Sequence, residues 1–410
     1  MSAAGRRASL VALAAIAGPG LLAGLSDDDA PGITTYSIMG ARYGYELLWV
    51  LALSTVALIV FHEVGSRVGV VTGQGLMGLI RDRYGVRIAA AALAALIVAN
   101  LGTTCAEFAG VAASLGLLGV PAWVSVPVAA VAVSALVLRG SFHRVERVLL
   151  ALSTVFAAYI LSGILAGPDW SAAARGLVVP SMPLDREAVL TATACLGTTL
   201  APWGLAFIQS YAVDKRLEPK DLVYERVDVI TGAVMTGVIG FFVVVACAAT
   251  LHADGRSIED ASDAADALSP LAGDLASLLF GAGLLGASLL AASILPLSTA
   301  YSISEVLGDE SAVDDSPGDA PVFYGSYGVV VVLAAAVVVV PGAPLVDILF
   351  LSQALNAILL LPLLFLIARI AGNSELMGAH VNGRVETAVV WTTMAAIALC
   401  VAALGVLSVL

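Results

Sequence analysis

Long apolar segments are the feature of this sequence that most limits the folds open to it. A transmembrane helix needs about 20 predominantly apolar residues, and segments of this kind, bounded by charged or turn-forming residues, recur along the 410-residue chain. Only 12% of the residues are charged, which excludes a soluble enzyme, and the apolar segments lack the alternation of a membrane β-barrel. The sequence therefore predicts an all-α polytopic membrane protein embedded in the lipid bilayer. The eleven expected spans are 10–40, 46–71, 88–117, 121–138, 147–167, 189–212, 228–251, 269–304, 322–341, 344–370 and 387–410.

Basic residues are distributed unevenly among the predicted loops. If the N-terminus is cytoplasmic, all but four of the 19 Lys and Arg residues lie on the cytoplasmic side, as is usual for membrane proteins. The four exceptions are Arg42, Arg175, Arg186 and Arg256. Residues 10–40 follow a basic pair as a signal peptide would, but they contain no convincing cleavage site. We therefore expect a protein of the cell (inner) membrane with a cytoplasmic N-terminus, a retained first span and a C-terminus outside.

Acidic residues and a Pro-Gly pair interrupt the first expected span. Residues 27–32 read Asp-Asp-Asp-Ala-Pro-Gly, and charged side chains are too costly for a regular helix that faces lipid. Pro31 removes a backbone donor and so frees the carbonyl of Asp27, four residues earlier. We expect a helix break at Pro31 and Gly32. The alternative is that the first span ends at Leu25 and that the acidic run is a loop.

The sixth expected span contains a similar interruption. Residues 197–204 read Gly-Thr-Thr-Leu-Ala-Pro-Trp-Gly, with the break at Pro202. An offset of five spans between two breaks is what two inverted five-span repeats would produce, and paired breaks indicate a substrate site near the membrane midplane. We therefore expect one transporter domain with repeat one at about 10–167, repeat two at about 189–370 and an extra helix at about 387–410. A coincidental proline kink is the alternative for either break.

Other polar residues lie deep within expected spans. Glu107 lies in the third span, and Gln353 and Asn356 lie three residues apart in the tenth, on one helix face. Intramembrane polar groups usually face a cavity or a partner. Glu63 precedes Arg67 by four residues, which predicts an ion pair on the helix surface.

At these residues the sequence resembles the Nramp family of divalent metal transporters. The matching stretches are 18–20, Asp29, 40–45, 67–73, 81–84, 106–110 and 376–378. The resemblance covers essentially the whole chain. It implies the LeuT-like fold, in which two inverted five-helix repeats are followed by an eleventh helix and helices 1 and 6 are broken.

The chain departs from the family pattern at the two breaks. The family has Asp-Pro-Gly-Asn in helix 1, whereas this chain keeps the acidic ligand as Asp29 and has Gly32 in the column of the Asn. In helix 6 the family has Met-Pro-His, and here Ala201, Pro202 and Trp203 stand in those columns. The chain is therefore similar to the magnesium-transporting branch of the family.

Further departures lie at the alignment positions whose residues transfer protons in the family. A second histidine of helix 6 aligns with Ile208, and the proton-accepting Asp of helix 3 aligns with Thr104. Glu107 is retained. The resemblance thus implies that coupling to protons is weak or absent.

The residues at the two breaks predict a metal site made of oxygen ligands. Asp29 supplies a carboxylate, the breaks supply carbonyls near Asp27, Thr198 and Leu200, and Gln353 supplies an amide oxygen. Such ligands suit Mg²⁺, Ca²⁺ or Mn²⁺, and we expect no sulfur or imidazole within reach. The predicted metal residues are Asp29, Leu200, Ala201 and Gln353, the additional metal or vestibule residues are Asp27, Asp28, Thr198 and Asn356, and the proton or polar pathway holds Glu107 and Thr104.

These features predict a secondary transporter that moves divalent metal cations, Mg²⁺ or Mn²⁺, by alternating access. The metal is the substrate, and we expect no cofactor, no nucleic acid and no obligate protein partner. Three alternatives remain: a LeuT-fold transporter of a small organic substrate such as an amino acid or amine, a membrane-embedded enzyme, and a metal sensor or scaffold. The enzyme is disfavoured because no histidine clusters with a nucleophile; the pair His62-Glu63 also lacks the second histidine of a zinc protease, since residue 66 is Ser.

Overall fold

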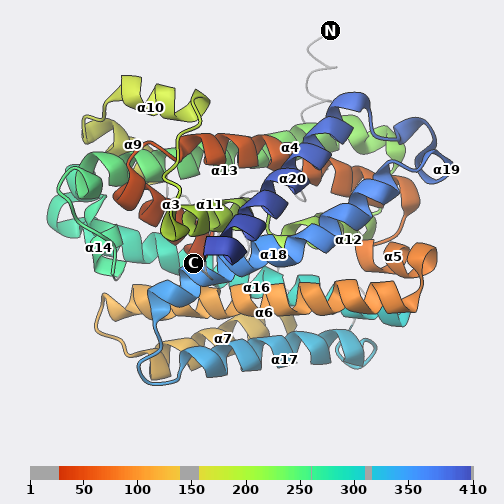
Figure 1. Ribbon diagram of the computed structural model, residues 1–410. Helices are drawn as coiled ribbons and strands as arrows, with labels where there is room; N and C mark the ends of the chain where they lie inside the picture. Colours follow the sequence, from red (N-terminus) through yellow and green to blue (C-terminus); the bar gives the residue numbers. More distant parts are fainter. Residues whose placement is uncertain (1–26, 139–156, 260, 310–315, 408–410) are drawn as a thin grey trace, which may run out of the picture.

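The computed structural model describes residues 27–138, 157–259, 261–309 and 316–407, and this part of the chain contains helices and no strands (Figure 1). Eight helical segments in it are long and apolar enough to cross a membrane: Leu48–Thr72, Val86–Gly116, Arg186–Asp214, Pro219–His252, Ala276–Leu307, Pro321–Val338, Leu345–Ala371 and Arg384–Leu407. The predicted all-α membrane class is confirmed. The signal-peptide alternative concerns the N-terminal residues, which lie outside the described ranges.

The helices follow the expected spans closely. The longer ones are α4 (Leu48–Thr72), α6 (Val86–Gly116), α7 (Ala122–Leu138), α13 (Leu222–Cys247), α16 (Ala276–Leu307), α17 (Pro321–Val338), α18 (Leu345–Ala371) and α20 (Arg384–Leu407). Three further helices belong to expected spans: α3 (Ala30–Tyr43), α11 (Arg186–Thr199) and α12 (Pro202–Asp214). The shorter helices are α5 (Leu76–Tyr84), α9 (Ala157–Leu165), α10 (Trp170–Val178), α14 (Ala261–Asp266), α15 (Ser269–Ala272) and α19 (Ser374–Met377).

Three of the expected spans are described only in part, among them the eleventh, 387–410, of which residues 408–410 lie outside the described ranges. The first, 10–40, is represented by α3 and the fifth, 147–167, by α9, because residues 1–26 and 139–156 lie outside the described ranges. The division into repeats at about 10–167 and 189–370 stays a prediction for the same reason.

Two helix starts differ from the expectation. The eighth span was expected from residue 269, but Gly273 adopts a positive φ of 52° that ends α15, and α16 starts only at residue 276. The seventh was expected from residue 228, but α13 starts six residues earlier. This extension is stable because Glu225 accepts a hydrogen bond from Ser66 at 2.7 Å and Arg226 pairs with Glu63.

The two half-helices α3 and α11 lie in the interior of the bundle. α3 packs against α13, α11 and α18, and α11 packs against α18, α20 and α4. On one side α6 packs against α16 and α18, with α7 and α17 outside it; on the other side lie α4 and α13 (Figure 1). Interior helices have no lipid-facing side, so polar residues on α3 and α11 lie within the protein.

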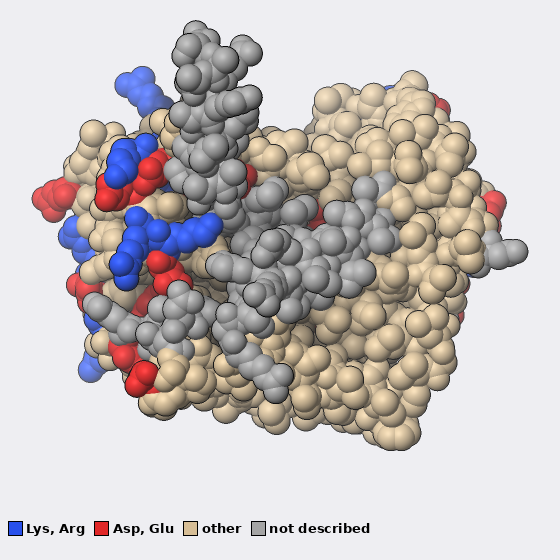
Figure 2. All heavy atoms as spheres, turned by 180° about the vertical axis from the view of Figure 1, so that it is seen from behind, with Lys and Arg blue, Asp and Glu red and all other residues tan. Residues whose placement is uncertain are grey.

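Basic residues gather at one end of the visible face. Figure 2 shows Lys and Arg side chains concentrated at the end where Figure 1 places α5 and α19. This end carries Arg81, Arg83 and Arg369, all expected on the cytoplasmic side. The distribution agrees with the expected asymmetry, while the orientation in a membrane stays a prediction.

Candidate functional site

The predicted break in the sixth span is present between α11 and α12. α11 ends at Thr199 and α12 begins at Pro202, so Leu200 and Ala201 lie between the two helices. Pro202 occupies the first turn of α12, where its missing N–H removes no intrahelical hydrogen bond. The carbonyl of Ala201 accepts a hydrogen bond from the N–H of Gly204 at 3.1 Å. One of its two lone pairs is therefore used by the turn and the other is left for a ligand.

The helix after the first predicted break begins where the sequence indicates. α3 starts at Ala30, and Asp29 caps it: its Oδ1 accepts a hydrogen bond from the N–H of Gly32 at 2.7 Å. Pro31 thus lies in the first turn of a new helix, a position that proline favours. The half of this span before residue 27 lies outside the described ranges.

Three oxygen atoms from the two breaks converge on Gly32. A Cβ atom at Gly32 would lie 2.7 Å from the carbonyl oxygen of Asp27, 2.9 Å from Oδ1 of Asp29 and 3.3 Å from Oγ1 of Thr198. Thr198 belongs to the last turn of α11, so this contact brings the two breaks side by side. Any side chain at Gly32 would occupy the space that these oxygens surround.

Four buried carboxylates lie at this junction. Asp27, Asp28, Asp29 and Glu107 are each at most 4% exposed. Within the described ranges, none of the four forms an ion pair with Lys, Arg or His. The carboxylate oxygens of Asp27 and Asp28 also have no hydrogen-bond partner there. Burying carboxylates in this way is costly unless cations, either protons or metal ions, neutralise them.

The acidic residues do not form a complete metal cluster by themselves. Within the described part of the chain, no group of three or more His, Cys, Asp or Glu side chains is placed to hold a metal ion. A cation at the junction would therefore complete its coordination with carbonyl oxygens, the Thr198 hydroxyl and water, which suits hard ions.

Glu107 of α6 approaches the start of α3. Its carboxyl group lies beside that of Asp29 and close to the N–H of Ala30. The close packing that allows this occurs one turn further on, where a Cβ atom at Gly110 would collide with the side chain of Ala30. Thr104 is the other predicted pathway residue. Its hydroxyl group donates a hydrogen bond to the carbonyl of Asn100 within α6 at 2.6 Å, so the hydroxyl proton is already used in a hydrogen bond.

Gln353 and Asn356 face the same side of α18, as predicted, and bond to each other. Oε1 of Gln353 accepts a hydrogen bond from Nδ2 of Asn356 at 3.0 Å, and that nitrogen also lies 2.9 Å from the hydroxyl of Thr103. The backbone of Gln353 touches Gly197 in α11 so closely that no side chain would fit there. Gln353 is thus next to the break, and Asn356 uses one of the two lone pairs of its amide oxygen, which leaves the other for an ion.

One residue near the site was missed by the sequence analysis. His62 of α4 is 2% exposed, and its Nε2 lies 3.2 Å from the position of a Cβ atom at Gly204, close to Asp27. An imidazole therefore borders the second break, while the expectation that the metal site uses no imidazole stays a prediction. The spacing of His62 from Gly65 and Gly69, which places all three on one helix face, was the available signal.

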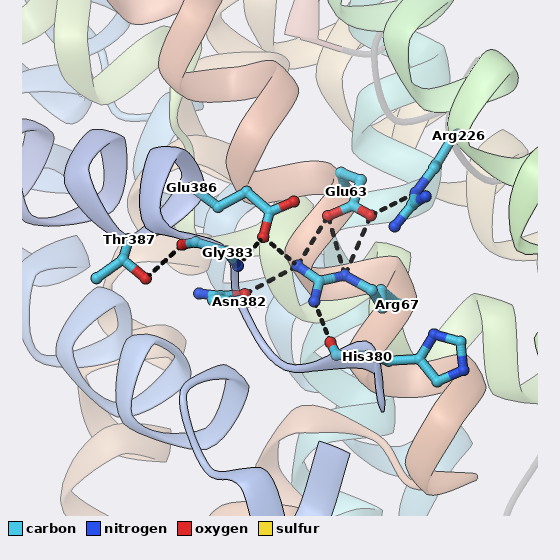
Figure 3. A network of polar contacts seen from close by, with 8 residues as sticks. All are labelled: Glu63, Arg67, Arg226, His380, Asn382, Gly383, Glu386 and Thr387. Atoms are coloured by element: carbon cyan, nitrogen blue, oxygen red, sulfur yellow. Dashed lines mark hydrogen bonds and ion pairs between the residues drawn. The ribbon is translucent and has the colours of Figure 1, made fainter. Parts of the chain in front are cut away.

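The predicted ion pair between Glu63 and Arg67 is part of a larger network (Figure 3). Arg67 is 1% exposed and contacts Glu63 at 3.0 Å, the carbonyl of His380, the side chain of Asn382 at 2.8 Å and Glu386 at 3.5 Å. The network joins α4 to the segment that leads into α20. It gives Arg67, in the stretch 67–73, a structural role and leaves Glu63 outside the site.

Comparisons with known proteins agree with this architecture. A family model described as natural resistance-associated macrophage protein-like (Nramp) matches residues 20–407. The divalent metal cation transporter MntH of Burkholderia ambifaria is 31% identical over 293 residues, which cover 68% of this chain and 66% of that protein. The MntH of Ralstonia nicotianae is 30% identical over 405 residues, which cover 93% of this chain and 88% of that protein.

Solved structures show the same fold. A manganese transporter of Eremococcus coleocola superposes with a TM-score of 0.78 at 18% identity, covering 95% of this chain and 85% of that one. MhsT in complex with L-phenylalanine gives a TM-score of 0.59 at 16% identity. These likenesses concern the fold alone and confirm the predicted LeuT-like class. With a family model that matches nearly the whole chain, the chain belongs to the Nramp family.

Proposed function

We propose that the protein is a secondary transporter that moves divalent metal cations, Mg²⁺ or Mn²⁺, across the membrane by alternating access. The observation that carries this proposal is the group of four buried carboxylates between the broken helices, none of which pairs with a basic side chain in the described ranges. Intramembrane acidic residues at a helix break mark an ion pathway. The names of the MntH relatives support a divalent metal as the substrate.

Asp29 is the central ligand in this proposal. Its carboxylate stands at the start of α3 beside the carbonyl of Asp27 and the hydroxyl of Thr198, which all surround Gly32. Leu200 and Ala201 contribute carbonyls from the second break, and Gln353 contributes the lone pair of its amide oxygen that Asn356 does not use. Because Gly32 has no side chain and that of Ala201 is small, we expect the site to admit an ion that keeps part of its water, as Mg²⁺ does.

Coupling to protons is weak or absent in this proposal. The Thr104 hydroxyl is bonded within its own helix, and Trp203 and Ile208 stand in the columns of the family's helix 6 histidines. Glu107 is the remaining carboxyl of the predicted pathway. The protein belongs in the cell (inner) membrane with its N-terminus cytoplasmic and its C-terminus outside.

Uptake into sealed proteoliposomes tests the proposal. Mg²⁺, Mn²⁺ and Ca²⁺ are supplied side by side while internal pH is recorded. We expect uptake of Mg²⁺ or Mn²⁺ without stoichiometric acidification. Metal binding without flux would indicate a sensor or scaffold, and stoichiometric internal acidification would contradict weak coupling.

A small organic substrate is the main alternative, since MhsT shares the fold. The acidic junction disfavours a substrate carboxylate, because like charges would meet in a buried site. An organic amine is compatible with the charge. Uptake of labelled amines by the same proteoliposomes, with no uptake of metal, would establish this alternative.

A further inference from the structure

A cavity of about 690 Å³ opens at the end of the molecule where the basic residues gather. It is bordered by the last turns of α5 and α18, by α19 and by the first turns of α20. Because α18 ends at Ala371 and α20 begins at Arg384, the cavity lies where two membrane helices reach the membrane surface. Phospholipid headgroups lie at this level.

Two exposed arginines border the cavity. Arg83 lies in the last turn of α5 and Arg369 in the last turn of α18. Neither side chain forms an ion pair or a hydrogen bond with another residue of the described ranges. Glu375 is the one carboxylate among the described residues that border the cavity. The border therefore carries one excess positive charge, which suits an anionic ligand.

Hydrogen bonds fix the segment between α18 and α20, which forms one wall of the cavity. The side chain of Asn373 caps α19, and the N–H of Asn382 donates to the carbonyl of Ala371 at 3.0 Å. The side chain of Asn382 also accepts a hydrogen bond from the buried Arg67 at 2.8 Å. This wall is thus formed before any ligand binds, which lowers the entropic cost of binding.

Another border of the cavity belongs to the lipid-facing surface of α20. Only 17% of the apolar stretch of α20 is buried, the smallest share among the eight membrane segments of the described chain. Trp391 borders the cavity and packs edge-on against Phe365 of α18, with ring centroids 6.1 Å apart. Both rings are about half exposed. Tryptophan is typical of the interface between lipid and water, so a ligand here can contact charged and apolar surface together.

We propose that this cavity binds the headgroup of an anionic phospholipid, with Arg83 and Arg369 holding its phosphate and Trp391 packing beside the start of its acyl chains. Arginine binds phosphate through two parallel N–H donors, and basic pockets at the ends of membrane helices bind anionic headgroups. A zwitterionic headgroup carries its own cation and gains less from the excess positive charge. The cavity is separate from the junction of the two breaks, so this inference goes beyond the proposed function and does not depend on it.

Native mass spectrometry of the purified full-length protein tests the site, because it gives the dissociation constant of the first bound lipid. The wild type should bind phosphatidylglycerol at least about tenfold more tightly than phosphatidylcholine, the factor that one charge-assisted hydrogen bond provides. Arg83→Gln/Arg369→Gln should lose this preference. Arg87→Gln/Arg384→Gln is the matched control, because it removes the same charge from two exposed arginines that do not border the cavity, and it should keep the preference.

A variant of opposite effect and a competing anion complete the test. Glu375→Gln removes the carboxylate at the cavity and should tighten phosphatidylglycerol binding, while inorganic phosphate in large excess should not displace the lipid. Equal affinity of the wild type for the two lipids, or equal losses in the two double variants, would overturn the inference. Displacement by phosphate would also overturn it, since the site would then be one for a free anion. Lipid binding as expected without metal flux in proteoliposomes would overturn the proposed function and leave the lipid site standing.

Discussion

Oδ1 of Asp29 accepts a hydrogen bond from the backbone N–H of Gly32 at 2.7 Å, which closes the first turn of α3 at the centre of the bundle. This bond fixes the carboxylate at the positive end of a half-helix, where negative charge is favoured. Because Gly32 has no side chain, the Asp27 carbonyl and the Thr198 hydroxyl approach the same space. In the function proposed above, a cap that ordinarily only stabilises a helix also binds the cation.

Replacing Asp29 with Asn should abolish transport and leave the fold intact. Asn caps helices about as well as Asp does, so the change removes mainly the negative charge. We expect metal uptake to fall by about 100-fold or more, because changing even the outer-shell partners of metal ligands costs about 10–100-fold. Asp27→Asn should have a smaller effect on uptake.

The control for this change is Asp185→Asn. Asp185 caps α11 by accepting a hydrogen bond from Ala188 at 2.8 Å, away from the junction. We expect wild-type uptake and an unchanged melting temperature. Normal transport by Asp29→Asn together with loss in Asp28→Asn would move the central ligand to Asp28.

Gly32→Ala should impair both folding stability and uptake. The new Cβ atom would lie within 3 Å of the Asp27 carbonyl and of Asp29 Oδ1, and overpacking of this kind costs about 1–3 kcal/mol. Thermal unfolding in detergent measures the first effect and proteoliposome uptake the second. In Gly325→Ala on α17, where no atom lies within 4 Å of the added methyl group, neither quantity should fall.

Ala201→Met should shift ion preference toward softer metals. A thioether at this position would suit Cd²⁺ and offer nothing to Mg²⁺, while filling space that a hydrated ion needs. Because Gly32 still lacks an amide oxygen, we expect a shift in the Cd²⁺-to-Mg²⁺ uptake ratio without a complete switch. An unchanged ratio in competition uptake would mean that Ala201 does not face the ion.

Arg67→Met should destabilise the junction between α4 and α20. Arg67 is buried, and removing one member of a buried ion pair costs about 3–5 kcal/mol. Arg42→Met is the comparison, because its ion pair with Glu187 is exposed and is worth at most about 1 kcal/mol. Thermal unfolding of both variants should therefore give a much larger loss for Arg67→Met. Similar losses would contradict the role assigned to the network in Figure 3.

The sequence by itself determined the helices and the second break. Long apolar runs form membrane helices because their backbone groups must pair internally in lipid, and the proline at residue 202 begins a new helix because it cannot donate to the preceding turn. The carboxylates of residues 27–29 likewise marked the site, since such charges are rare inside spans. These effects depend on composition or on neighbouring residues, so they can be predicted from a single stretch of sequence.

Only the tertiary structure decided which distant residues meet. His62 reaches the second break because glycines on α4 allow a close approach to α12, and Asn356 bonds to Thr103 because α18 packs on α6. Arg67 finds its partners more than 300 residues away along the chain. Such contacts depend on how whole helices pack against one another, and the spacing of residues within one helix shows which face is packed but not which helix lies against it.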